Sequence, residues 1–210
     1  MKLYYLSGAC SLSAHIALYE SKIEFDAVSV DLQSRMTSEG EAYDKINSKG
    51  YVPALQLENG ELLTEVVAVL QYIADRDPSS KLAPALGTME RYRLMEWLSF
   101  INSEIHKSFS PLFSPIASEE TKQFTRNRLQ KRMDWLEGAI GIKAHLLGDH
   151  FTIADAYLFT VLNWFGMAGM NLAEWPNLKR YHKGVGSRPK VQQAIKTEGS
   201  PGFCAPLPVI

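Results

Sequence analysis

A cysteine near the N-terminus stands where its side chain could be reactive. Cys10 follows a short apolar run (2–7) that is typical of a buried strand, and it precedes a segment with helical spacing of apolar residues (11–21). The unpaired N–H groups and the macrodipole of a helix N-terminus favour a thiolate, so this position predicts a lowered pKa for the Cys10 thiol. Residues 10–13 read Cys-Ser-Leu-Ser, so the thiol could form a mixed disulfide with a small thiol, without a resolving cysteine nearby. A small buried residue at a turn is the alternative interpretation.

A second signal is the tripeptide Tyr51-Val52-Pro53, where proline opens an apolar, strand-like run. Proline cannot donate to a strand ladder, so it is unusual at the start of an interior strand. A cis Val52–Pro53 bond would present the Val52 N–H and C=O to whatever lies beside Cys10. An ordinary trans proline on an edge strand is the alternative, and trans is the commoner form.

A third signal is Thr64-Glu65-Val66, which begins a helical pattern directly after a strand-like run. Free N–H groups at a helix start can hold a carboxylate, and the Glu65 side chain can hold an ammonium group. Together they suit the zwitterion of an amino acid. An acidic first turn that merely complements the helix dipole is the alternative.

A fourth signal is a polar stripe within a long helical pattern. Ser99, Ser103 and His106 are separated by steps of four and three, which places them on one side of a regular helix. His106 is followed by Lys107. Taken alone, His106 is more simply interpreted as a surface histidine or a satisfied core histidine than as a functional residue.

The elements that must position these residues fall into two groups. The first 76 or so residues show the order β-α-β-α-β-β-α, which is that of a thioredoxin-like domain. The second strand is expected at 25–32, followed by a polar segment (33–47) with weak helical character. Asn59-Gly60 between two apolar runs predicts a two-residue hairpin, and residues 64–76 follow as a helix. The early strands should be parallel, joined by a crossover helix.

The rest of the chain is predicted to be all-helical. We expect a thioredoxin-like domain at 1–77, a linker at 78–87, an all-helical domain at 88–199 and a proline-rich tail at 200–210. Two helices show one apolar face each, made by Leu94, Leu98, Ile101 and Ile105 and by Leu129, Met133, Leu136 and Ile140. A third, within 148–170, is apolar nearly all round and should lie in the core, with Thr152 and Asp155 as its capping box. Two further helices are expected at 177–184 and 189–198.

Composition excludes several classes of function. The 210 residues carry a formal net charge of -1, which gives no general attraction to nucleic acid or to an anionic membrane. Two cysteines, Cys10 and Cys204, make no disulfide framework, and no Cys/His spacing indicates a metal site. The four apolar residues ahead of Cys10 are too few for an export signal. We therefore expect a cytoplasmic protein without a bound metal.

The four signals occur together in the order typical of one family. The chain resembles the cytosolic glutathione transferases, specifically the bacterial beta class, over roughly residues 1–200. The resemblance is carried by the segments Gly8-Ala9-Cys10-Ser11, Val52-Pro53-Ala54-Leu55, Leu63-Thr64-Glu65, the stretch 96–107 and Phe151-Thr152-Ile153-Ala154-Asp155-Ala156-Tyr157. It implies a two-domain fold, a homodimer, glutathione as cosubstrate and no permanently bound cofactor.

The resemblance also implies roles for individual residues. Cys10 would lie against the glutathione sulfur, Val52 would pair its backbone with the cysteinyl moiety, and Pro53 would be cis. Glu65 and the N–H of Val66 would hold the γ-glutamyl group, and Arg35 would reach the glycine end. The second-domain wall would comprise Ser99, Ser103, Glu104, His106 and Lys107, partly supplied by the partner subunit, and the apolar substrate would lie among Phe109, Phe113 and Trp164. Val66 and Ser99 depart from the residues expected at their positions, which bears on affinity.

The expected reaction is attack of the glutathione thiolate on a hydrophobic electrophile, a detoxifying conjugation. The first-helix terminus, Cys10 and His106 would supply the donors that lower the pKa of the glutathione thiol. Thiol transfer or peroxide reduction through a Cys10–glutathione disulfide is a second enzymatic interpretation. A non-catalytic binding or regulatory protein with the same fold is the alternative class.

Overall fold

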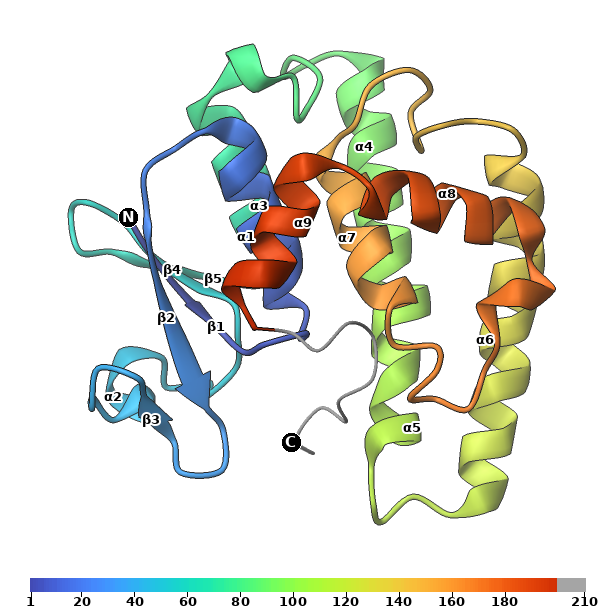
Figure 1. The fold of residues 1–210 in the computed structure, drawn as a ribbon, viewed down its shortest axis with the longest axis horizontal. Coiled ribbons are helices and arrows are strands. Elements are labelled where there is room, and N and C mark those ends of the chain that lie inside the picture. The colour runs from blue at the N-terminus through green and yellow to red at the C-terminus, as the bar shows by residue number, and fades with distance from the viewer. Residues whose placement is uncertain (200–210) are drawn as a thin grey trace.

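The structure, a computed structural model, describes residues 1–199, in which a small sheet with its helices is followed by a bundle of helices (Figure 1). The first half contains β1 (Lys2–Tyr5), α1 (Ser11–Ser21), β2 (Asp26–Asp31), β3 (Met36–Thr37), α2 (Tyr43–Ile46), β4 (Ala54–Gln56), β5 (Leu62–Thr64) and α3 (Val66–Arg76). The predicted β-α-β-α-β-β-α order is therefore confirmed, with the short strand β3 as an addition. The predictions for residues 200–210, including Cys204, lie outside the described residues.

The strands form one sheet in the order β3-β2-β1-β4-β5. β1 pairs with β2 in parallel, as expected for a right-handed crossover through α1, and the other pairs are antiparallel. Tyr4 of β1 lies opposite Ala54 of β4. Because these two central strands are antiparallel, the loop after β1 meets the segment just before β4. This register brings Cys10 beside Val52 and Pro53.

The hairpin between β4 and β5 differs from the two-residue turn predicted at Asn59-Gly60. The Gly60 N–H donates to the Leu57 carbonyl and the Leu57 N–H donates to the Glu61 carbonyl, so three residues form the loop. Gly60 has φ +86°, a left-handed conformation that glycine adopts without cost. The Asn-Gly signal thus marks the right place, but Gly60 completes a three-residue loop.

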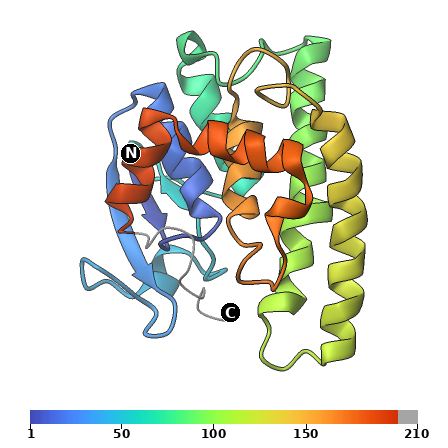
Figure 2. The same cartoon turned by 45° about the vertical axis from the view of Figure 1, so that its right-hand side comes forward.

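The second half is helical, beginning with a one-turn helix at Pro78–Ser80. It continues with α4 (Met89–Phe100), a π-helical segment (Ile101–Ile105), a 3₁₀ turn (His106–Phe109), α5 (Ser110–Phe113), α6 (Glu119–Ile140), α7 (Ile153–Leu162), a 3₁₀ turn (Leu172–Glu174), α8 (Pro176–Gly186) and α9 (Pro189–Thr197). The two predicted apolar faces are fully buried. Figure 2 shows the long α4 and α6 side by side at the edge of the bundle.

The helix α7 forms the centre of the molecule, as predicted from its uniformly apolar sequence. All ten of its residues are buried, including Asp155. The expected capping box is present: the Asp155 carboxylate accepts from the Thr152 N–H at 2.8 Å and from the Thr152 hydroxyl at 2.9 Å. The same carboxylate also accepts from the Leu146 N–H and the Tyr181 hydroxyl, so it fixes the start of α7 to its neighbours.

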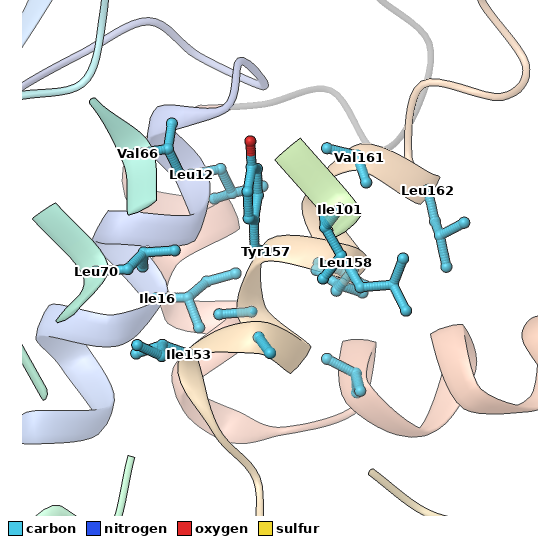
Figure 3. Packing of buried hydrophobic residues seen from close by; sticks show 14 of the residues in the cluster. Leu12, Ile16, Val66, Leu70, Ile101, Ile153, Tyr157, Leu158, Val161 and Leu162 are labelled. Carbon is cyan, nitrogen blue, oxygen red and sulfur yellow. The ribbon is translucent and has the colours of Figure 1, made fainter. Parts of the chain in front are cut away.

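The two halves share one core. The helix α1 packs against α3 of its own half and against α7 and α9 of the helical half. Figure 3 shows Leu12 and Ile16 of α1, with Leu70 of α3, facing residues of α7. Apolar side chains at such a shared surface fix the relative position of the two halves. The predicted domain boundaries at 77 and 88 stay a prediction.

Candidate active site

A cavity of about 470 Å³ lies where the two halves meet, beside the thiol of Cys10. From the first half it is lined by Cys10, Val52, Pro53, Glu65 and Val66, all of which were predicted site residues. From the second half the predicted lining residues are His106, Lys107, Phe109, Phe113 and Trp164. The fold therefore brings together ten residues that the sequence singled out, from segments as far apart in the chain as Cys10 and Trp164.

The loop before α1 holds Cys10 by its backbone. Ser11 begins the helix, and its hydroxyl both accepts from the Leu6 N–H and donates to the Leu6 carbonyl, at 3.1 Å each. Gly8 has φ +72°, which allows the sharp turn out of β1. The Cys10 Sγ lies 3.1 Å from the Val52 carbonyl oxygen, so the thiol donates to it. The Val52–Pro53 bond is cis, as the resemblance implied.

The expectation of a lowered pKa for Cys10 is wrong. Burial raises the pKa of the Cys10 thiol to about 12, although the N–H groups of Cys10 and Ser11 act in the opposite direction. The helix N-terminus is thus present and oriented as predicted. The free-energy cost of removing the thiolate from water is larger than the stabilisation that the helix N-terminus provides. At neutral pH Cys10 is a protonated thiol and a hydrogen-bond donor.

The second half holds the same loop through hydrogen bonds to both backbone groups of one residue, Gly8. The Gly8 N–H donates to a Glu198 carboxylate oxygen at 2.9 Å, and the Trp164 ring N–H donates to the Gly8 carbonyl at 2.9 Å. The other Glu198 oxygen lies 3.0 Å from His15 Nδ1, and both of these side chains are fully buried. Burial raises the pKa of Glu198, opposed by its contacts with His15 and Gly8. Sequence reasoning missed this clamp because its members are about 180 residues apart.

The start of α3 is the place where the sequence predicted a site for an amino-acid zwitterion. Glu65 precedes Val66, the first residue of α3, and has φ +69°. A residue other than glycine adopts this conformation at a cost of about 1–3 kcal/mol, which is typical of functional sites. The Glu65 carboxylate lies 2.8 Å from Lys49 Nζ, which also contacts the Thr64 hydroxyl. Lys49 lines the cavity and was not predicted, because no spacing marks it.

Arg35 lies elsewhere in this structure. Its guanidinium pairs with Asp44 at 2.9 Å and approaches the Gly50 carbonyl at 3.5 Å. Arg35 is absent from the cavity lining within residues 1–199. Lys49 is the cation that lines the cavity beside Glu65.

The predicted polar stripe is only partly present at the cavity. Asn102, His106 and Lys107 line it, whereas Ser99 and Ser103 are exposed elsewhere and Glu104 pairs with Arg132 at 2.7 Å. The physical reason is the π-helical segment at 101–105. An extra residue in one turn rotates all later side chains relative to the earlier ones, so His106 no longer shares a side with Ser99.

His106 is held in an aromatic wall. Its ring packs edge-on against Trp164 at a centroid distance of 4.9 Å, and Trp164 packs against Phe109 at 5.4 Å. Burial, aided by Lys107, lowers the pKa of His106 to about 4, so the imidazole is neutral at pH 7. Phe113 stacks on Phe109. The aromatic part of this wall therefore offers an apolar surface beside a neutral imidazole.

The sheet topology, with a thiol beside a cis-proline at the start of a strand, is that of a thioredoxin-like domain. A helical bundle packed against this domain forms the second wall of the cavity. Two family models match the chain: the glutathione S-transferase N-terminal domain at residues 8–76 and the C-terminal domain at 103–198. The chain is 44% identical to the glutathione S-transferase GstA of Escherichia coli O157:H7 over 95% of its own length and 99% of that protein's. It belongs to the glutathione S-transferase family.

Comparison with solved structures indicates which class of glutathione S-transferase the chain resembles. A sphingomonad glutathione S-transferase complexed with glutathione superposes with a TM-score of 0.92 at 45% identity, covering 95% of this chain and 99% of that one. A bacterial beta class glutathione S-transferase from Sphingomonas chungbukensis gives 0.91 at 45% identity, with coverage of 95% and 99%. The predicted resemblance to the beta class is confirmed. No helix within residues 1–199 has the length and apolar character to span a membrane.

Proposed function

We propose that the protein conjugates glutathione to hydrophobic electrophiles. The observation that carries the proposal is the cavity itself, which has a thiol and a cis-proline backbone on one wall and Phe109, Phe113 and Trp164 on the other. Its sequence relatives support the same activity. In the reaction the glutathione S–H loses its proton, the sulfur electron pair forms a C–S bond, and the leaving group departs with its own electron pair.

Each part of glutathione has a proposed place on the first wall. The Val52 backbone pairs with the cysteinyl unit, and the Cys10 thiol donates to the glutathione sulfur. Glu65 and the N–H of Val66 hold the γ-glutamyl zwitterion. The ammonium of that group would displace Lys49 from Glu65. The freed Lys49, rather than the Asp44-paired Arg35, would then be available for the glycine carboxylate.

We also propose a cytoplasmic homodimer. Ser99 and Ser103 are exposed outside the cavity of their own chain, which fits the prediction that a partner subunit supplies part of the second-domain wall. Trp135 of α6 is 55% exposed although it packs against Trp97 and Phe100 of α4. An exposed aromatic cluster of this kind is a typical interface feature. Light scattering coupled to gel filtration measures the molecular mass; a monomer at micromolar concentration would contradict the dimer.

The test of the main proposal is conjugation of a chloronitrobenzene by the full chain with reduced glutathione, followed by absorbance. We expect turnover that saturates in glutathione. A rate equal to that of the buffer would refute the proposal. Thiol–disulfide exchange through Cys10 is a proposed minor activity. Incubation with oxidised glutathione followed by mass mapping of the peptide that contains Cys10 tests it. Incubation of Cys10→Ala under the same conditions is expected to give no adduct on this peptide, and conjugation retained in this variant would mean that Cys10 serves disulfide exchange only.

A further inference from the structure

The His106 imidazole is one end of a chain of hydrogen bonds that runs through the buried Tyr157 hydroxyl to Asn102. Its Nδ1 lies 2.6 Å from the Tyr157 hydroxyl oxygen, and that hydroxyl lies 3.0 Å from the Asn102 side-chain carbonyl oxygen. Tyr157 belongs to α7 and is fully buried. Figure 3 shows its ring between Leu12 and Ile101, with the phenol oxygen pointing away from the apolar side chains. The hydroxyl is thus held at the edge of the core, where it meets His106.

The direction of this chain follows from what each atom can do. An amide carbonyl oxygen only accepts, so the single proton of the Tyr157 hydroxyl is donated to Asn102. The phenol oxygen can then only accept from His106, which requires a proton on Nδ1. A neutral imidazole carries one proton, so its Nε2 is left with a free lone pair. His106 lines the cavity, and within residues 1–199 no side chain is bonded to Nε2.

We propose that Tyr157 and Asn102 are positioning residues that hold His106 in its Nδ1-protonated tautomer, so that Nε2 accepts the proton of the glutathione thiol. The S–H bond breaks, the proton passes to Nε2, and the electron pair stays on sulfur for attack on the electrophile. This assigns His106 as the acceptor, in place of the donor role expected from the sequence. The proton transfer from glutathione rests on the proposed conjugation, whereas the assignment of the His106 tautomer does not.

The surrounding charges are compatible with this role. Among residues 1–199, the other titratable groups that line the cavity are Lys107, which follows His106, and four from the first half of the chain: Cys10, Lys49, Tyr51 and Glu65. Burial and Lys107 lower the pKa of His106 and so disfavour the imidazolium. A thiolate formed next to the ring favours it, because an opposite charge at short range stabilises the charged form. The proton is therefore taken up only when the thiolate forms.

The decisive experiment is ¹⁵N NMR of the full chain with labelled histidine at pH 7, without glutathione. The five histidines are distinguished by loss of one signal pair in His106→Gln. We expect a protonated Nδ1 and an unprotonated Nε2 for His106 in the native protein. Asn102→Leu removes the acceptor, so the Tyr157 proton is free to donate to Nδ1 and the ring should switch to the Nε2-protonated tautomer. Asn102→Asp keeps an acceptor and should keep the native tautomer.

Kinetics then connects the tautomer to the reaction. Asn102→Leu is expected to lower kcat by roughly 10²-fold, the size of a general-base contribution, with a much smaller change in the KM for glutathione. Tyr157→Phe keeps the ring and its packing and should leave a mixture of tautomers. A native His106 protonated on Nε2, or an unchanged tautomer in Asn102→Leu, overturns the proposal. Native protein with the expected tautomer but no conjugation would instead refute the proposed function alone.

Discussion

The protonated state of Cys10 makes a quantitative prediction about its alkylation. Burial raises the pKa of this thiol from 9.0 to about 12. At pH 8 the thiolate fraction is then about 10³-fold smaller than for an unburied cysteine. A more basic thiolate is intrinsically more nucleophilic, which restores about 20-fold for a Brønsted coefficient near 0.45. Cys10 in the folded chain should therefore react with iodoacetamide roughly 50-fold more slowly than in the unfolded chain.

The assay compares the same residue in both states. Samples are pulsed with iodoacetamide between pH 7 and pH 10, quenched and digested, and the Cys10 peptide is quantified by mass spectrometry, with the chain in urea as the reference. In urea the rate should level off above about pH 9, whereas in the folded chain it should rise about tenfold per unit without a plateau. A plateau at or below pH 8 in the folded chain would mean that the helix N-terminus outweighs burial, and the reasoning would be refuted.

Three further predictions concern stability. Burial lowers the pKa of His106 and of His182 to about 4, so the unfolded chain alone binds their protons between pH 6.5 and 4. This contribution to the free energy of unfolding is therefore complete above pH 6.5 and is lost as the pH drops, by roughly 3 kcal/mol per histidine at pH 4. Urea unfolding at pH 7 and pH 5 should show a smaller loss of unfolding free energy in His182→Asn than in the native protein. An equal loss in the two proteins would contradict the pKa assigned to His182. Glu198→Ala removes the buried partner of a histidine and of a loop N–H, so it should lower the unfolding free energy by about 3–5 kcal/mol. The matched control Glu96→Ala, which breaks an exposed ion pair, should cost less than about 1 kcal/mol, and similar urea midpoints for the two variants would refute the clamp. Asp155→Ala leaves four donors unpaired and should lower the unfolding free energy by more than about 4 kcal/mol. Asp155→Asn keeps an acceptor and should lower it less. Thermal unfolding measures both variants, and equal losses of stability would show that hydrogen bonding is not the cause.

The sequence could predict the first wall of the site because sheet topology places it. Cys10 follows β1 and Val52 precedes β4, and these two strands are antiparallel neighbours. Once the order of strands is recognised, their loops must meet at the same edge of the sheet. Glu65 follows β5, the next strand along, so its approach to the same cavity is dictated in the same way. No side-chain detail is needed for these contacts.

The second wall of the cavity was predicted less well because the helix that carries it contains one irregular turn, at residues 101–105. Counting steps of four and three from Ser99 assumes a regular helix up to His106. The π-helical segment breaks that count, so Asn102 lines the cavity while Ser103 does not. The segment contains no proline or glycine that would mark it. Lys49 was missed for a similar reason, because it is placed by a turn with no periodicity to extrapolate.

The pKa of Cys10 was predicted in the wrong direction because two opposing effects on it differ in size. The charge effect of a helix terminus is local, and it contributes about 0.3–1 kcal/mol, less than one pKa unit. Burial of a thiolate shifts a pKa by up to about 3–5 units, and it depends on side chains from the distant half of the chain. A local pattern therefore predicts where the thiol lies but not whether it is charged. Since the protonated Cys10 donates, the anion that the helix terminus favours must come from the ligand. In the proposed reaction, the N–H groups of Cys10 and Ser11 and the Cys10 S–H would act together on the glutathione sulfur.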